Sequence, residues 1–229
     1  MSLLDIFFPR CCVGCGKLGA YFCRDCTEKI RIYESQRCPV CARTAFEGTT
    51  HYKCCGKEQL DGLVSVFPYR DTVGKALVQL KYRFASDLAE SLVRLVFEKT
   101  SREYFGFLRY GRGWTLVPVP LYWRRQNWRG FNQAEILGKL LADGLKIKFT
   151  TDLLIRKRKT DPQVGLDKEA RRKNIQGAFS VKPDSVFIIR DSKFILFDDV
   201  WTTGATVSEC GRILKRAGAG RVWGLTLAR

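Results

Sequence analysis

One stretch of the chain constrains the fold more than any other, because it joins an apolar run to two acids and a hydroxyl-rich turn. Residues 194–197 are apolar and suited to a buried strand. Asp198 and Asp199 follow at once, and the next residues are mostly small or hydroxyl-bearing, among them Thr202, Thr203, Gly204, Ala205 and Thr206. An amphipathic run over residues 207–217 then predicts a helix. The stretch thus predicts a strand, a loop and a helix in succession.

This loop has the composition of a site for a phosphorylated sugar. In a parallel α/β sheet, ligands bind at the carboxyl ends of the strands, where Asp198 and Asp199 are expected. A helix N-terminus binds phosphate through its unpaired N–H groups, and adjacent carboxylates accept hydrogen bonds from sugar hydroxyls or bind a divalent metal. The alternative is that the acids and threonines only cap a helix. A Walker A loop is excluded, because no Gly-Lys-Ser/Thr sequence occurs.

Nine of the ten cysteines precede residue 56, and most of them form Cys-x-x-Cys pairs. The first residues do not resemble a secretory signal, so this spacing indicates metal binding and not disulfides. Four thiolates make a closed tetrahedral zinc site, and the first such set is Cys12, Cys15, Cys23 and Cys26. Cys11 is expected to stay outside it.

A second zinc site begins with Cys38 and Cys41, and its other half is open. His51, Cys54 and Cys55 compete for two positions. His51 has knuckle spacing to Cys54, and the alternative is that it is a polar surface residue. We expect each site to use consecutive ligands, as in two ribbons, with a cross-braced arrangement as the alternative. A module of about 55 residues has little core, so the expected role of the zinc is structural.

The formal net charge is +17, and residues 121–190 carry sixteen Lys and Arg against seven Asp and Glu. Residues 1–60 are less basic, and two zinc ions on eight thiolates would leave them near neutral. A positive field favours polyanions such as phosphorylated sugars, nucleic acid or anionic lipid, unless the charge serves solubility alone. No apolar run reaches the ~18 residues of a membrane span. We expect a cytoplasmic protein, with the inner face of the membrane as the alternative location.

Alternating strand and helix patterns after the cysteines predict an α/β fold in which helices flank a mostly parallel sheet. The expected domains are a zinc module at 1–59 and an α/β domain at 60–229. Strands are expected at 63–69, 115–120, 149–155, 177–181, 186–189, 194–197 and 221–228. Helices are expected at 71–84, 86–99, 134–141 and 207–217. Residues 156–174 are predicted to be a basic loop that closes over the ligand, the alternative being a disordered loop.

Several motifs together resemble one known family. They are the 194–206 stretch, Val117-Pro118-Val119-Pro120, Arg129-Gly130-Phe131-Asn132-Gln133-Ala134 and the cysteine module. In this combination and order the chain resembles the ComF family, bacterial competence-associated proteins with a type I phosphoribosyltransferase domain. The resemblance covers nearly the whole chain. It departs from the family after Cys55, where the final Cys-x-x-Cys has no second thiol.

The resemblance implies a site for phosphoribosyl pyrophosphate (PRPP) and Mg²⁺. Asp198 and Asp199 would hold the ribose hydroxyls and the metal, and the turn from Thr202 to Thr206 would cradle the 5′-phosphate. Val119, Pro120 and Arg129 would hold the pyrophosphate.

The resemblance implies further residues around this site. Lys81 and Arg83 would lie near it, the alternative being solvated charges at a helix end. Thr160, Gln163, Arg171 and Asn174 match the family's catalytic loop, so Asp198, Asp199, Gln163 and Arg171 are the expected catalytic residues.

The implied function is a Mg²⁺-dependent phosphoribosyltransferase associated with DNA uptake. No side chain stands out as a general base, and no acceptor is indicated, so a non-catalytic role stays open. One such role is handling single-stranded DNA, since Trp123 and Trp128 lie among arginines and aromatic rings stack on bases. The alternative is that both rings are buried under a loop. Another role makes the zinc module a docking surface for a helicase or a recombination mediator.

Overall fold

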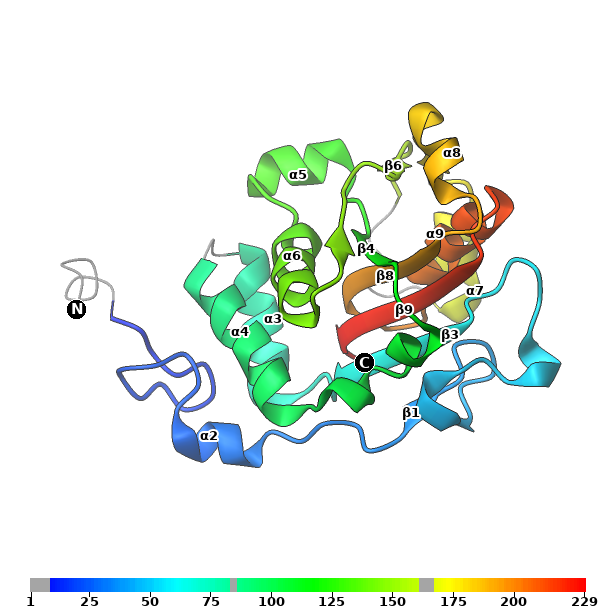
Figure 1. Cartoon of the computed structure of the whole chain (residues 1–229). Helices are drawn as coiled ribbons and strands as arrows, with labels where there is room; N and C mark the ends of the chain where they lie inside the picture. The colour runs from blue at the N-terminus through cyan, green and yellow to red at the C-terminus, as the bar shows by residue number, and fades with distance from the viewer. Residues whose placement is uncertain (1–8, 83–85, 161–166) are drawn as a thin grey trace.

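The computed structural model describes residues 9–82, 86–160 and 167–229, and Arg83 and Gln163 lie outside them. At its centre five parallel strands form one sheet in the order β3-β9-β8-β4-β5 (Figure 1). The strands are β3 (Gly62–Phe67), β4 (Trp114–Pro118), β5 (Lys148–Phe149), β8 (Lys193–Val200) and β9 (Arg221–Ala228). This confirms the predicted fold class.

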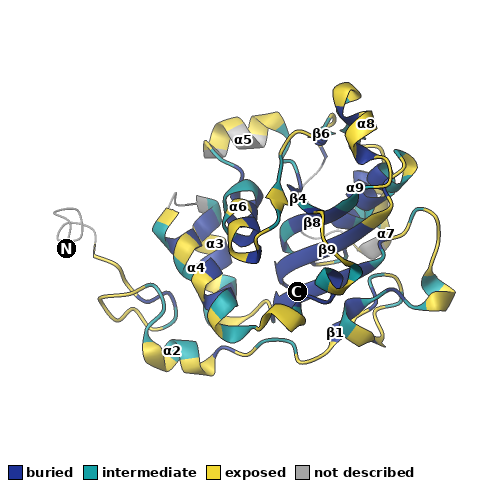
Figure 2. Ribbon diagram, in the orientation of Figure 1, coloured by how far each residue is buried: buried dark blue, intermediate teal, exposed yellow. Residues whose placement is uncertain are grey.

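Each face of the sheet has its own hydrophobic core, because successive side chains of a strand point to opposite faces. On β8, Ile195 and Phe197 belong to a cluster with α3 (Asp71–Tyr82), α4 (Ser86–Lys99) and α6 (Gln133–Leu145). Phe194 and Leu196 belong to a second cluster with α9 (Ala205–Arg216). The central strands are buried on both sides (Figure 2). This explains the unbroken apolar run at residues 194–197 of β8.

The strand order creates a topological switch point between β4 and β8. From β4 the chain passes through α6 to β5 at one edge, whereas β8 continues through α9 to β9 on its other side. Adjacent strands whose connections leave in opposite directions open a space outside their carboxyl ends, where ligands bind in α/β proteins. The predicted motif at 119–120 follows β4, and the motif at 198–206 begins at the carboxyl end of β8 and continues into the loop after it.

The cysteine-rich segment runs along one side of the α/β domain (Figure 1). Its first half includes α2 (Arg24–Lys29) and lies against α3, where the Lys75 ammonium donates to the Gly14 carbonyl oxygen at 3.3 Å. Its second half contains the hairpin of β1 (Gln36–Arg37) and β2 (Thr44–Ala45). The Gln36 side chain and the Ser65 backbone of β3 exchange two hydrogen bonds of 2.9 and 3.2 Å.

Two strand predictions are wrong, the one at 149–155 in part and the one at 186–189 entirely. Residues 149–155 do not form one strand, because the Asp152 N–H bonds to the Thr150 hydroxyl and turns the chain. β5 therefore ends at Phe149, and β6 (Leu154–Arg156) pairs antiparallel with β7 (Phe179–Val181) outside the main sheet. Residues 186–189 form the helix α8 (Val186–Ile189), since a short apolar run has no decisive period.

The remaining elements are short. They are α5 (Trp123–Arg129), α7 (Lys168–Ile175) and the 3₁₀ turns η1 (Phe46–Gly48), η2 (Tyr52–Cys54), η3 (Arg102–Tyr104), η4 (Gly106–Tyr110) and η5 (Pro183–Ser185). Within the described ranges, none of the helices combines the length and the apolar character needed to cross a membrane.

Candidate functional site

The carboxyl ends of β4 and β8 bring the two sequence motifs together. Pro118 is the last residue of β4 and pairs with Phe197 of β8. The next residue, Val119, donates its N–H to the Phe197 carbonyl oxygen at 2.8 Å, so the 119–120 turn begins beside the two acids. We call the set Val119, Pro120, Asp198, Asp199 and Thr202–Thr206 the switch-point site.

Strand alternation separates the two acids. Asp199 follows the parity of Ile195 and Phe197, so it faces the α3 and α6 side of the sheet. There its Oδ2 lies 3.1 Å from the Lys81 ammonium of α3 and accepts a 3.4 Å hydrogen bond from the Gln133 amide of α6. Asp198 has the opposite parity and faces the α9 side. Asp199 is buried in an ion pair, and Asp198 is half-buried.

The pKa values reflect this arrangement. Burial raises the pKa of Asp198, and the charge of neighbouring Asp199 raises it further. For Lys81, burial favours a lower pKa, but the charge of Asp199 outweighs it and the pKa is raised. Lys81 therefore stays positively charged. A cation bound beside Asp198 would stabilise the charged form of its carboxyl group, which burial disfavours.

The turn after β8 is held in one compact conformation. Gly204 has φ +75° and caps the N-terminus of α9. A Cβ at this position would lie 2.5 Å from Cε2 of the Trp201 indole, so only glycine fits without displacing the ring. Thr202 is exposed, and Thr203 and Thr206 are half-buried. Backbone N–H groups of the first turn of a helix bind anions, so the turn is suited to a phosphate.

Two residues that contact the switch-point site were not predicted as site residues. Asn132 accepts the Ala134 N–H and caps α6, while its amide donates to the Val119 carbonyl oxygen at 3.2 Å. Gln133 reaches Asp199 from the same turn. An asparagine directly before a helical run is a capping signal, and that signal was available in the sequence.

The structure places the other predicted residues in different parts of the fold. Arg129 is the last residue of α5, and Arg171 is half-buried on α7. Thr160 is buried and accepts a hydrogen bond from Arg156. Asn174 lies on α7, and its carbonyl oxygen accepts a 2.9 Å bond from Arg158. Part of the predicted closing loop is therefore the helix α7, which lies against α9.

The first cysteine cluster fits a structural zinc ion. The thiols of Cys12, Cys15, Cys23 and Cys26 all lie within 4.8 Å of one another, as four ligands around one tetrahedral ion require. Burial favours a higher pKa for Cys12, but backbone N–H groups, including that of Cys23 at 3.5 Å, lower it to about 6. Cys11 is outside the cluster, and its thiol donates to the Pro9 carbonyl oxygen.

The second cluster combines three thiols with the histidine. Cys38, Cys41, His51 and Cys54 lie together within the same limit. The Nδ1 atom of His51 faces Cys41 at 3.2 Å, and its Nε2 lies 3.0 Å from the Thr44 carbonyl oxygen. A carbonyl partner on one ring nitrogen leaves the other for a metal. Cys55 stays outside, with its thiol donating to the Thr50 carbonyl oxygen at 3.7 Å.

Residues 3–57 match the family model of the double zinc ribbon domain. In agreement with the two clusters, the N-terminal segment is a double zinc ribbon that binds zinc. Among solved structures, the chain is similar to adenine phosphoribosyltransferase from Leishmania tarentolae, with 14% identity, a TM-score of 0.35 and coverage of 87% of this chain and 84% of that one.

Proteins similar over most of the chain bear names that refer to DNA utilization or to competence. DNA utilization protein YhgH of Escherichia coli (strain K12) is 30% identical over 208 residues, covering 87% of this chain and 86% of the relative. Competence protein F of Haemophilus influenzae is 29% identical over 234 residues, with coverages of 97% and 99%. Competence protein ComFC of Bacillus subtilis is 27% identical over 221 residues, with coverages of 90% and 83%. With these relatives and a double zinc ribbon ahead of a parallel sheet, the chain belongs to the ComF family.

Proposed function

We propose that the switch-point site binds PRPP with Mg²⁺, and that the protein takes part in the handling of DNA during bacterial competence. One arrangement carries the proposal: the acids lie at the carboxyl end of β8, the hydroxyl-rich turn follows that strand, and the 119–120 turn follows the adjacent strand β4. The names of the relatives, DNA utilization protein and competence protein, support the cellular role.

Different residues of the site bind different parts of PRPP. The turn from Thr202 to Thr206 and the N-terminus of α9 hold the 5′-phosphate. Asp198, the less buried of the two acids, holds Mg²⁺ and the ribose hydroxyls. Asp199 stays paired with Lys81 and adds its negative charge from the other face of β8. The 119–120 turn holds the pyrophosphate. When bound, Mg²⁺ supplies charge stabilisation for the leaving pyrophosphate, and the chain contributes position and electrostatics.

Release of pyrophosphate from PRPP tests this function. Asp199→Asn should abolish Mg²⁺-dependent release, because it removes a site carboxylate. Asp143→Asn, an acid on α6 that pairs only with Lys139 among the described residues, should leave release unchanged. Absence of release by the folded wild-type protein would count against catalysis.

A second function is favoured by the surface of α5. Trp123 and Trp128 are 54% and 74% exposed, and the Arg124 guanidinium lies 5.1 Å from the Trp123 ring centroid. Exposed rings among arginines are suited to stacking on bases of single-stranded DNA. This role predicts oligonucleotide binding that falls steeply with salt, weakens in Trp123→Ala/Trp128→Ala and survives Asp199→Asn. Binding unchanged by loss of both rings would refute it.

A further inference from the structure

A second cleft lies beside the switch-point site, between the second zinc cluster and α9. Its volume is about 600 Å³. One wall is the chain around Cys38, with Arg37, Pro39 and Val40, and the opposite wall is the outward side of α9. We call it the zinc-side cleft. It shares Thr202 and Thr203 with the switch-point site, since both threonines also line the cleft.

The zinc-side cleft is strongly basic. Its lining includes five arginines and two acids: Arg37, Arg172, Arg212, Arg216, Arg229, Glu58 and Glu209. Arg37 and Arg172 are exposed, and neither side chain pairs with a carboxylate in the described ranges. Two cations in the lining of one cleft, neither paired with a carboxylate in the described ranges, favour an anion in that cleft.

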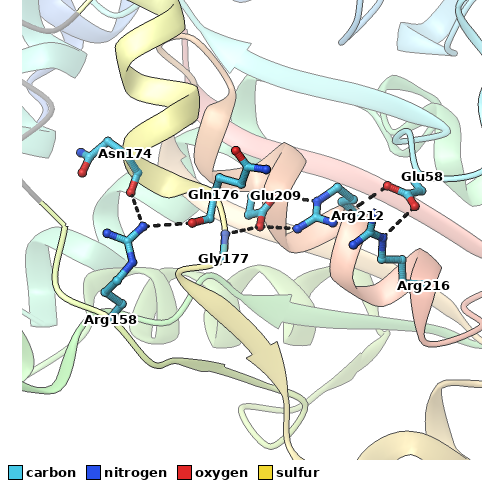
Figure 3. A network of polar contacts seen from close by, with 8 residues as sticks. All are labelled: Glu58, Arg158, Asn174, Gln176, Gly177, Glu209, Arg212 and Arg216. Carbon is cyan, nitrogen blue, oxygen red and sulfur yellow. Dashed lines mark hydrogen bonds and ion pairs between the residues drawn. The ribbon is translucent and has the colours of Figure 1, made fainter.

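Two of the remaining arginines, Arg212 and Arg216, are held in place by the acids (Figure 3). Buried Glu209 accepts two bonds from Arg212, of 2.6 and 2.7 Å, and the Gly177 N–H at 2.8 Å. Glu58 accepts from Arg216 at 2.7 Å and lies 4.0 Å from Arg212. Since Arg212 and Arg216 are four residues apart, they share one side of α9. These guanidiniums are therefore ordered before any ligand arrives.

We propose that the zinc-side cleft binds a small ligand with two or more phosphate groups, of the size of a nucleoside polyphosphate. Guanidiniums bind phosphate oxygens in bidentate fashion, and the volume is within the range of small-molecule sites. Pro39, Val40 and Trp201 provide apolar surface for a ring, and Thr202 and Thr203 provide hydroxyls. This site goes beyond the proposed PRPP site and has its own residues, Arg37 and Arg172.

The test is titration of ATP and of inorganic pyrophosphate into the full-length, zinc-loaded protein by calorimetry. In Arg37→Ala/Arg172→Ala, ATP affinity should fall about 100-fold, tenfold for each lost guanidinium. Arg37→Lys/Arg172→Lys keeps the charge but not the fork and should lose about tenfold. Arg94→Ala/Arg112→Ala removes two exposed arginines outside the cleft and should change nothing. Zinc content is measured on every variant. If Arg37→Ala/Arg172→Ala loses zinc, the ATP affinity of Arg37→Lys/Arg172→Lys becomes the deciding measurement.

The design separates the two sites. Asp199→Asn should lose PRPP and keep ATP, whereas Arg37→Ala/Arg172→Ala should keep PRPP binding. If the wild-type protein binds no PRPP, the proposed function fails while the ATP titration still tests the cleft. Unchanged ATP and pyrophosphate affinity in the arginine variants would overturn the inference. It is also overturned if these variants weaken only an oligo(dT) strand, because the cleft would then take nucleic acid.

Discussion

The conformation of the turn at Gly204 makes a quantitative prediction for Gly204→Ala. Residue 204 has φ +75°, and a Cβ there would overlap the indole of Trp201. Left-handed backbone costs a non-glycine residue about 1–2 kcal/mol. Overpacking against a buried ring adds about 1–3 kcal/mol. The expected loss of unfolding free energy is therefore about 2–5 kcal/mol, a large share of the stability of a typical domain.

Gly113→Ala is a matched control. Gly113 also has a left-handed backbone, with φ +86°, but a Cβ there would meet no described atom within 4 Å. It should cost only the backbone term, about 1–2 kcal/mol. The difference between the two variants isolates the contact with Trp201.

Urea unfolding at constant zinc, with both variants beside the wild type, measures this difference. The double variant Trp201→Ala/Gly204→Ala should be more stable than the sum of the single losses predicts, because removal of the ring removes the clash. Equal destabilisation by Gly204→Ala and Gly113→Ala would refute the explanation of the turn.

Three further predictions concern charge and metal. Lys81→Met should lower the free energy of unfolding, measured with urea, by about 2 kcal/mol, because it leaves Asp199 without its cation. This is less than the loss expected on breaking a fully buried ion pair, and an unchanged midpoint would refute the pairing. The raised pKa of Asp198 means that the folded protein holds a proton there above the ordinary carboxyl range, so wild-type stability relative to Asp198→Asn should fall as pH rises through that window, and a flat difference would contradict it. Zinc content should fall from two ions per chain to one in Cys54→Ser and stay at two in Cys55→Ser, as a colorimetric zinc assay can check.

Much of the fold could be predicted from the sequence because local pattern and tertiary context agree. The helix predicted at 86–99 has the same bounds as α4 in the structure, because Ser86 precedes apolar residues that recur at helical spacing. The failures are at residues where the local pattern is ambiguous. The run 186–189 buries only Ile189 completely, so helix and strand were equally compatible with it. The strand predicted at 149–155 is interrupted by a hydrogen bond to the Thr150 hydroxyl, and the apolar pattern of the sequence gives no sign of such a bond.

The sequence motifs could be expected to lie near one another, but their contacts could not be predicted. Motif residues at the carboxyl ends of β4 and β8 are adjacent because the two strands are paired. Their separate environments depend on strand parity and on helices distant in sequence, which is why Lys81 was expected near the site but its pairing with Asp199, and the contact of Gln133, were not. The zinc-side cleft joins residues 37, 172 and 216, and no local pattern indicates that such residues meet.

The central proposal is that the switch-point site, at the carboxyl ends of β4 and β8, binds a phosphorylated ribose. Calorimetric titration of PRPP, with and without Mg²⁺, tests it most directly when the wild type is compared with Asp198→Asn/Asp199→Asn. The account predicts saturable, Mg²⁺-dependent binding by the wild type and its loss in the variant. No binding by the folded wild type, or equal affinity in both proteins, would contradict it.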